Sequence, residues 1–202
     1  MNRHEKQSIE KYNIIAADYD LTFEGRFTVK FKNKILALCD VSDGDAVLDV
    51  GCGNGTLINA INKKGNINAF GVDISPQMVK ECQKRYNNIS FKISTGEQLP
   101  FESNSFNILT ICCVLHHLNN PHNFFIEAKR VLKSSGILIV GEPWYPIGLR
   151  QFVDWVVAPL LKAGDNKTFS HKKLKELFVD NGFEIIEIYK NGNIQIIKGR
   201  KI

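Results

Sequence analysis

The hydrophobic positions of this chain change their spacing several times along its length. In the first forty residues, apolar side chains recur every three or four positions over 5–20 and again over 27–39, which predicts two amphipathic helices. From residue 46 onward, short apolar runs alternate with segments of helical spacing. The expected strands are these runs, at residues 46–50, 67–73, 89–93, 105–112 and 137–141.

Local signals indicate where the intervening helices begin and end. Ser75-Pro76 and Asn120-Pro121 each combine a capping side chain with a first-turn proline, so a helix is expected to start at both places. Lys63-Lys64-Gly65 and Ser134-Ser135-Gly136 are the expected ends of two helices. Because strands alternate with helices five times, the sequence predicts an α/β fold with a doubly wound parallel sheet and helices on both faces.

The alternation breaks after the fifth strand. Residues 143–165 carry three prolines around a predicted aromatic-rich helix that contains Trp144, Tyr145, Phe152 and Trp155. A further helix is expected from the cap Ser170 to Asn181-Gly182. Two more strands, at 183–189 and 194–198, are separated by Asn191-Gly192-Asn193, which predicts a terminal hairpin.

A glycine-rich loop follows the first strand. Asp49 precedes Gly51-Cys52-Gly53-Asn54-Gly55, and the apolar residues after it have helical spacing. Glycines allow positive φ and close approach of a ligand, and the first N–H groups of the helix are then available to bind that ligand. The dinucleotide fingerprint would need glycine at position 56, where this chain has Thr56.

A carboxylate closes the second strand at the same edge of the sheet. Asp73 lies 18 residues after Gly55, and a carboxylate can accept two hydrogen bonds from a ribose diol. Together with this aspartate, the loop resembles motif I and its partner acid in the class I S-adenosylmethionine (SAM)-dependent methyltransferases. Three further segments resemble the same family, namely 12–20, 94–101 and 105–118, the last of which ends in Leu115-His116-His117-Leu118.

The resemblance is to the small-molecule, ubiquinone/menaquinone-biosynthesis-like branch (methyltransferase type 11). It implies one domain over 1–202, with a helical cap at about 1–40 and a lid insert at about 143–168. It also implies a seven-stranded Rossmann-like sheet in the order 3-2-1-4-5-7-6, with strand 7 antiparallel. The cofactor-binding residues that it implies are Tyr19, Asp49, Gly51, Cys52, Gly53, Asp73, Ile74, Met78, Thr95, Gly96, Glu97, Cys112 and His117.

Two positions depart from the family pattern. Thr95 replaces an aspartate that usually binds the adenine amino group, so adenine recognition would depend on the Gly96 and Glu97 backbone or on the Thr95 hydroxyl. Asn107 replaces a second aspartate in a turn. Arg26 and Lys30 are expected to be within reach of the cofactor carboxylate.

The implied reaction transfers a methyl group from SAM to a small molecule and leaves S-adenosylhomocysteine. The sulfonium is already an activated leaving group, so the main task is alignment, and a base is needed only where the acceptor must lose a proton. Candidate bases are His116, His117, Tyr19 and Glu142, and the sequence assigns none of them as catalytic. The aromatic residues of the insert favour an apolar or aromatic acceptor.

Composition narrows the function classes. Adjacent histidines without a third ligand, and five cysteines without Cys-x-x-Cys spacing, predict neither a metal site nor a disulfide framework. The formal net charge of +5 is spread along the chain. Lys30, Lys32 and Lys34 are interpreted as solvated faces of helices, which disfavours a nucleic-acid partner. No apolar run is long enough to span a membrane and the first residues are not those of a signal peptide, so we expect a cytoplasmic monomer or homodimer.

Two alternatives stay open at this point. An NAD-dependent oxidoreductase would share the loop and Asp73, but it lacks the glycine at 56 and a recognisable set of hydride-transfer residues. A SAM-binding regulator or inactive partner subunit is consistent with the departures at Thr95 and Asn107.

Overall fold

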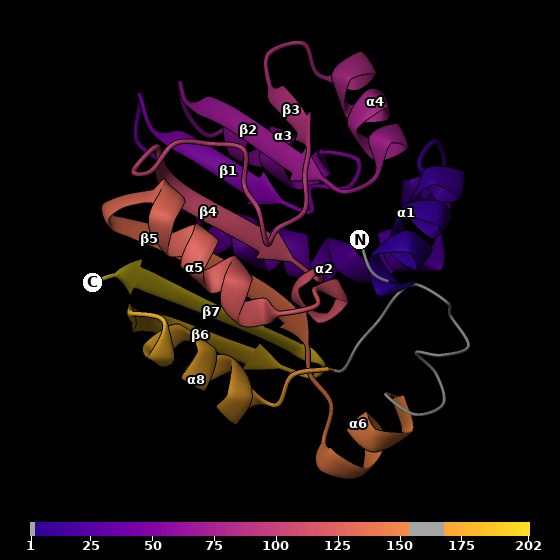
Figure 1. The fold of residues 1–202 in the computed structure, drawn as a ribbon, viewed down its shortest axis with the longest axis vertical. Helices are drawn as coiled ribbons and strands as arrows, with labels where there is room; N and C mark the ends of the chain where they lie inside the picture. Colours follow the sequence, from indigo (N-terminus) through magenta and orange to yellow (C-terminus); the bar gives the residue numbers. More distant parts are fainter. Residues whose placement is uncertain (1–2, 154–167) are drawn as a thin grey trace.

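The computed structural model describes residues 3–153 and 168–202, which form a seven-stranded sheet in the order β3-β2-β1-β4-β5-β7-β6 (Figure 1). The strands are β1 (Ala46–Val50), β2 (Asn68–Asp73), β3 (Ser90–Ile93), β4 (Phe106–Cys112), β5 (Leu132–Pro143), β6 (Phe183–Asn191) and β7 (Ile194–Lys201). Strands β1 to β5 pair in parallel, and β7 runs antiparallel to both of its neighbours. This topology confirms the expected strand order.

Helices cover both faces of the sheet. The helices are α1 (Arg3–Ile15), α2 (Phe23–Leu38), α3 (Thr56–Asn62), α4 (Pro76–Arg85), α5 (Pro121–Val131), α6 (Ile147–Phe152) and α8 (His171–Asp180), with short 3-10 turns η1 (Tyr19–Leu21) and η2 (Leu115–His117). Buried side chains of α2, α3 and α4 pack in one hydrophobic cluster and those of α5 and α8 in another, with the sheet between them (Figure 1). Helix α1 lies across the edge toward which β1, β2 and β4 point.

The parallel strands are apolar along most of their length because both of their faces are covered. In β4, six of the seven residues are buried, and the outward-facing exception is Asn107. After the register shift between Phe106 and Ile108, Ile108 belongs to the cluster on the α2 side, whereas the next residue, Leu109, belongs to the cluster on the α5 side. Alternation along each strand therefore builds two cores from one sheet.

The register brings the ends of β1 and β2 together. Asp49 lies opposite Gly71 and Val50 lies opposite Val72, so the loop after β1 emerges beside Asp73. Gly71 leaves room for the ring of Phe91, because a Cβ there would lie 2.7 Å from a ring carbon. The expected meeting of the glycine loop with Asp73 thus follows from the pairing of β1 with β2.

The boundaries of the first two helices differ from the prediction. The helix expected over 5–20 ends at Ile15, and Tyr19 begins a separate 3-10 turn. The second helix starts at Phe23, ahead of the predicted residue 27, because the Thr22 hydroxyl accepts a hydrogen bond from the Gly25 N–H at 3.0 Å and caps it. The break between the two helices directs Tyr19 inward, where it is buried.

The prediction for the end of α5 was wrong. The helix ends at Val131, and Ser134-Ser135-Gly136 lie within β5. Leu132 leaves the helix to pair with Phe106 in the neighbouring strand, and its side chain is fully buried. The register shifts between Phe106 and Ile108, and Ser135 has a φ of 58°. Core packing of Leu132 therefore outweighs the local capping signal.

The C-terminal hairpin is confirmed, with Gly192 at a φ of 55° in its turn. Of the predicted insert, Pro143 is the last residue of β5, and residues 147–152 form the short helix α6. Trp155 and Pro159 lie outside the described residues, so the lid over 143–168 stays a prediction. No helix within 3–153 or 168–202 is both long and apolar enough to cross a membrane.

The cluster on the α5 side gives a stability prediction. The ring of Phe125 is fully buried and lies 5.2 Å from that of Phe178 and 6.0 Å from that of Phe183, centroid to centroid. Phe125→Ala should lower the free energy of unfolding by about 3–5 kcal/mol, because it leaves a cavity. The adjacent Ile126 is 58% exposed, so Ile126→Ala should cost under about 1 kcal/mol. Urea denaturation checks both variants, and equal losses would contradict this description of the core.

Candidate functional site

The loop after β1 has a backbone that only glycines adopt easily. Gly51, Gly53 and Gly55 have φ values of 66°, 52° and 76°. At Gly51 an added Cβ would also lie 2.4 Å from a methyl group of Val114. Cys52 donates its N–H to the Val72 carbonyl at 2.9 Å, which ties the loop to β2. The positive φ values disfavour any side chain at these three positions, and at Gly51 a side chain would also clash with Val114.

Asp73 connects the loop to the end of β2. One carboxylate oxygen accepts a hydrogen bond from the Gly53 N–H at 2.8 Å, and the other accepts one from the Ser75 N–H at 2.9 Å. Burial raises the pKa of Asp73, and the backbone donors, Ser75 first, partly offset that rise. Each oxygen retains acceptor capacity for a further hydrogen bond.

A cavity of about 890 Å³, its open mouth included, lies above this edge of the sheet. All thirteen residues predicted to bind the cofactor line it, so the structure brings the entire set together. These residues are Tyr19, Asp49, Gly51, Cys52, Gly53, Asp73, Ile74, Met78, Thr95, Gly96, Glu97, Cys112 and His117.

Asp49 is a buried carboxylate in the wall of this cavity. The Thr110 hydroxyl donates to its Oδ1 at 2.7 Å. Burial raises the pKa of Asp49 to about 7, although the hydrogen bond from Thr110 and the charge of Lys32 act in the opposite direction. The carboxyl therefore changes its charge close to neutral pH.

Lys32 is the cationic residue of the cavity, and interpreting it as a solvated lysine was wrong. Its Nζ donates to the Thr56 hydroxyl at 2.8 Å and lies 5.4 Å from the centre of the Tyr19 ring. The two cations expected near a cofactor carboxylate lie elsewhere. Arg26 donates to the Leu21 carbonyl, and Lys30 donates to Asn193.

The two departures from the family pattern have different surroundings. Thr95 lines the cavity, and its hydroxyl accepts a hydrogen bond from the Glu97 N–H at 3.3 Å. Asn107 lies at the other end of β4, where its Oδ1 accepts hydrogen bonds from the Ala46 N–H and Lys133 Nζ. Asn107 thus holds the sheet together, and its replacement of aspartate has no direct bearing on the cavity.

The N-terminal helix closes one side of the cavity through polar contacts. Tyr12 Oη lies 3.2 Å from His117 Nε2, and Asn13 Oδ1 accepts a hydrogen bond from the Ser75 hydroxyl at 2.7 Å. Glu5 also lines the cavity and accepts a hydrogen bond from Asn119. Helix α1 therefore covers the carboxyl edge of the sheet (Figure 1).

The four candidate bases fall into two groups. Tyr19 and His117 line the cavity, whereas His116 and Glu142 lie outside its lining and are joined by a hydrogen bond, with 2.6 Å between Nδ1 and Oε2. Burial raises the pKa of the Tyr19 phenol, so Tyr19 stays protonated at neutral pH and cannot act as a base there. Within the described residues, no group of three or more potential metal ligands is present.

Sequence reasoning missed several residues that line the cavity. The most informative are Thr28 and Lys32, one helical turn apart on α2 and on the same face. The buried Phe31 and Ile35 beside them mark this face as inward, a signal that the sequence contains. Cys113 and Val114 also line the cavity, and Cys113 has a φ of 55°, which the sequence gives no sign of.

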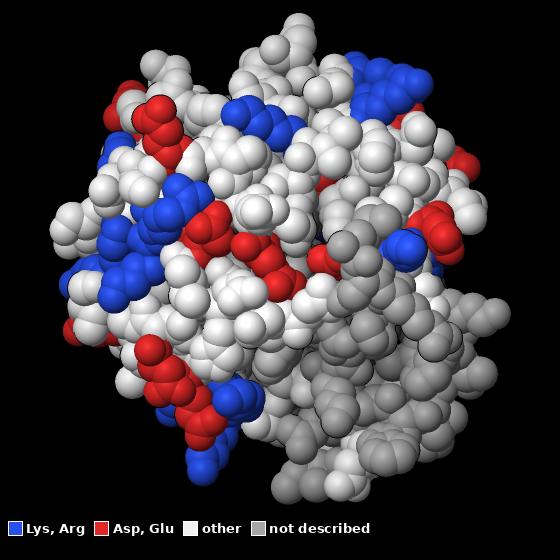
Figure 2. Space-filling view, in the orientation of Figure 1, with Lys and Arg blue, Asp and Glu red and all other residues white. Residues whose placement is uncertain are grey.

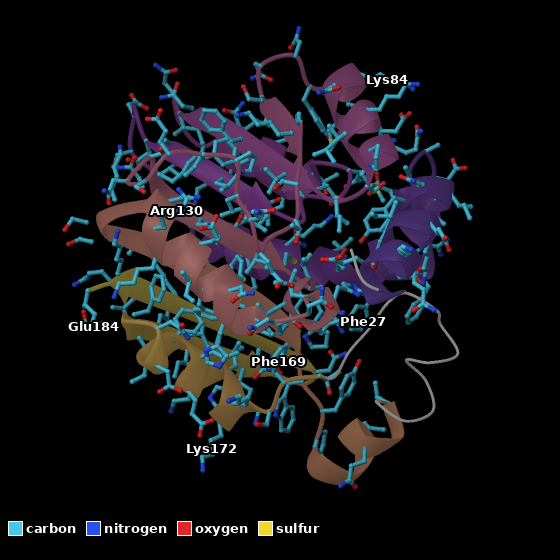
Figure 3. All side chains as sticks on the ribbon, in the orientation of Figure 1. Phe27, Lys84, Arg130, Phe169, Lys172 and Glu184 are labelled. Atoms are coloured by element: carbon cyan, nitrogen blue, oxygen red, sulfur yellow. The ribbon has the colours of Figure 1, made fainter. Side chains whose placement is uncertain are left out.

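The charge distribution favours a cationic ligand. The lining contains four carboxylates, those of Glu5, Asp49, Asp73 and Glu97, and one lysine, Lys32. Figure 2 shows acidic side chains near the middle of one face, while most Lys and Arg residues lie toward its periphery. Basic side chains likewise extend outward from several elements in Figure 3, with Lys84 and Lys172 as labelled examples. On the described part of this face, the basic side chains gather toward the edges, apart from the acidic group near its middle.

Comparison with known proteins connects this geometry to a family. Residues 48–140 match the model of a methyltransferase domain. A demethylmenaquinone methyltransferase from Tropheryma whipplei is 27% identical over 201 residues, covering 92% of this chain and 81% of the relative. A protein of the same description from Renibacterium salmoninarum is 30% identical over 139 residues, which cover 67% of this chain and 58% of the relative.

Solved structures share the fold at low identity. A Haloferax volcanii protein described as a methyltransferase, in complex with the Trm112 methyltransferase activator, has a TM-score of 0.80 at 22% identity, covering 94% of this chain and 97% of that one. A geranyl diphosphate methyltransferase bound to sinefungin has a TM-score of 0.75 at 16% identity, covering 88% and 79%. A [4+2]-cyclase also shares the fold, so the fold alone does not determine the reaction.

The sheet order and the antiparallel β7 differ from the all-parallel dinucleotide-binding fold, which disfavours the oxidoreductase alternative. The sheet order, the matched domain and the curated relatives together show that the chain belongs to the class I SAM-dependent methyltransferases.

Proposed function

We propose that this protein transfers the methyl group of SAM to a small acceptor of apolar or aromatic character. The observation that carries the proposal is the hydrogen bond from the Gly53 N–H to Asp73, because it joins the loop and the acid around one cavity. In this arrangement the two Asp73 oxygens accept hydrogen bonds from the ribose hydroxyls. Ile74 and Met78 enclose the adenine, with its polar edge against Thr95, Gly96 and Glu97.

The methionine part of SAM then lies between β1, β4 and α2. Its sulfonium is a cation, and the excess of carboxylates in the lining would stabilise it. Lys32 is placed to bind the methionine carboxylate, and Asp49 and the Cys112 backbone lie on the side of the amino group. Tyr19 and His117 cover this end of the cofactor.

The position of helix α1 supports a small acceptor. Helix α1 lies over the carboxyl edge and is joined to the strand ends by Tyr12, Asn13 and Glu5, so a polymer could reach the methyl group only by displacing it. Trp144 follows β5 directly, and Lys190 Nζ lies 3.4 Å from the centre of its ring. Trp144 therefore packs against the β6–β7 hairpin and is absent from the cavity lining, so the apolar character of the acceptor rests on the insert's composition.

The proposal is tested with SAM labelled in its methyl group. Wild-type protein is incubated with a small-molecule cell extract, with total tRNA and with a protein fraction, and label and S-adenosylhomocysteine are measured in each. Label should enter a small apolar product, and Asp73→Asn should abolish this transfer, while the matched change Asp180→Asn on α8 should not. Label found only in tRNA or protein would contradict the proposal.

Lys32 should contribute to cofactor affinity through its charge. Lys32→Met keeps most of the side chain's length but removes a charged hydrogen bond, worth about 1.5 kcal/mol or more, and should weaken SAM binding about tenfold. Lys30→Met is the matched control, since Lys30 contacts Asn193 and should leave the affinity within about twofold of wild type. Isothermal titration calorimetry measures both. Unchanged affinity in Lys32→Met would refute its contact with the carboxylate.

Asp49 should make SAM binding depend on pH. Because its pKa is about 7 in the ligand-free protein, the carboxyl is mostly neutral at pH 6 and mostly ionised at pH 8. The ionised form attracts the cationic cofactor, so SAM affinity should rise about five- to tenfold between these two values. Asp49→Asn should remove this rise, and Asp45→Asn, in the turn before β1, should retain it. A rise that persists in Asp49→Asn would show that another group is responsible.

A further inference from the structure

A chain of polar side chains runs from the cavity, through the glycine loop, to the N-terminal turn η1. Lys32 Nζ on α2 donates to the Thr56 hydroxyl at 2.8 Å, and that hydroxyl donates to Asn54 Oδ1 at 3.1 Å. Asn54 Nδ2 then donates to Asp20 Oδ1 at 2.6 Å. The chain thus joins α2, the first residue of α3, the loop and η1, and of its four residues only Lys32 lines the cavity.

Every hydrogen bond in the chain has the same direction. An ammonium can only donate and an ionised carboxylate can only accept, so the charges of Lys32 and Asp20 fix the direction at both ends. Between them, the Thr56 hydroxyl and the Asn54 amide each accept one hydrogen bond or donate one on either side. Hydrogen bonds that run head to tail between opposite charges polarise one another. The chain therefore acts as one unit, which is weakened when either end is lost.

Asn54 is the buried centre of the chain. It is 0% exposed, and both polar atoms of its amide are used within the chain. A buried donor that loses its acceptor costs free energy, so this conformation of the loop requires Asp20 to stay in place. Asp20 is itself held from α4, where Arg85 Nη1 lies 3.5 Å from its Oδ2 and Arg85 Nη2 donates to the Ala17 carbonyl at 3.1 Å.

The turn η1 is also fixed against α2. The Thr22 hydroxyl donates to the Tyr19 carbonyl at 2.7 Å, and a Cβ at Gly25 would lie 2.0 Å from that carbonyl oxygen. Tyr19 lines the cavity, and the centre of its ring lies 5.4 Å from Lys32 Nζ. The chain and the turn together therefore surround the end of the cavity where Lys32 lies.

This arrangement holds the Lys32 ammonium in place before a ligand enters. A long, flexible side chain loses rotamer freedom when it binds a carboxylate, and this loss weakens binding. The hydrogen bond to Thr56 and the contact with the Tyr19 ring restrict that freedom in advance. An ammonium has three donors, so two remain for a ligand after Thr56 has taken one.

Resting on the proposed function, in which Lys32 binds the methionine carboxylate, we propose that Asp20, Asn54 and Thr56 are positioning residues for that contact. The N-terminal turn η1 then sets the affinity of the site for the amino-acid part of the cofactor. It contributes little to the affinity for the adenosine part, which lies beside Asp73 and Met78 in the proposed complex.

The test compares two ligands that differ at the methionine end. S-adenosylhomocysteine carries the amino-acid carboxylate, whereas 5′-methylthioadenosine has the same adenosine and a thioether sulfur but no carboxylate. In calorimetric titrations, Asp20→Ala should weaken S-adenosylhomocysteine binding about fivefold and leave 5′-methylthioadenosine binding within about twofold of wild type. Asp20→Asn keeps an acceptor oxygen for Asn54 and should lose less affinity than Asp20→Ala.

Asp18→Ala is the matched control. It removes the same charge two residues away, from a side chain that makes no capping hydrogen bond to η1, and should leave both affinities within about twofold. Thermal unfolding of each variant, followed by circular dichroism, checks that it is folded. An equal loss of affinity for the two ligands in Asp20→Ala would show a merely structural role and would overturn the proposal. Unchanged affinity for S-adenosylhomocysteine would overturn it too.

Thr56→Val tests whether the chain acts as one unit. Valine has nearly the shape of threonine but no hydroxyl, so this change interrupts the chain between Lys32 and Asn54. Thr56→Val should weaken S-adenosylhomocysteine binding about fivefold, and adding Asp20→Ala should weaken it by no more than about a further twofold, since the chain is already broken. Independent losses, about 25-fold together, would contradict a shared chain.

Lys32→Met keeps this proposal separate from the proposed function. Like Asp20→Ala, it should lose affinity for S-adenosylhomocysteine and not for 5′-methylthioadenosine. Selective loss in Lys32→Met without any in Asp20→Ala would overturn the chain and leave the Lys32 contact standing. Selective loss in Asp20→Ala alone would also overturn it, because the chain would not act through Lys32. These titrations need no turnover, so absence of methyl transfer to small molecules would count against the proposed function alone.

Discussion

One hydrogen bond, from the backbone N–H of Gly53 to the carboxylate of Asp73, holds the functional edge of this protein together. It joins the loop after β1 to the end of β2, and it depends on the parallel register that places Asp49 opposite Gly71. Three glycines with positive φ give the loop the conformation that directs this N–H toward the acid. The wall of the cavity formed by the glycine loop and the end of β2 follows from this constraint.

The two ends of the site differ in their electrostatics. Asp49 and Asp73 are buried carboxylates whose pKa values are raised by desolvation, so an ionised pair is costly until a cation enters. In the proposed complex the sulfonium would supply that cation, and Lys32 would balance the carboxylate at the other end of the same ligand. The pair of His116 and Glu142 lies apart from these groups, outside the residues that line the cavity.

Much of this arrangement could be predicted from the sequence, because the alternation of strands and helices and the glycine loop are local patterns. The strand order and the thirteen cavity residues came from the family resemblance, which those patterns and a few short motifs support. Lys32 was assigned to the wrong environment because charge alone suggests solvent, whereas its neighbours Phe31 and Ile35 face the core. The end of α5 was misplaced because Leu132 is governed by a contact with β4, which no local signal encodes.

The hydrogen bond between His116 and Glu142 also joins residues 26 positions apart, so only the folded sheet shows it.

At the carboxyl edge of the sheet, the glycine loop and Asp73 should enclose one nucleoside. A crystal structure with S-adenosylhomocysteine bound tests it most directly. The account predicts both ribose hydroxyls within hydrogen-bond distance of the Asp73 carboxylate and the sulfur directed toward β4. An adenosine bound elsewhere, or a ribose without contact to Asp73, would contradict it.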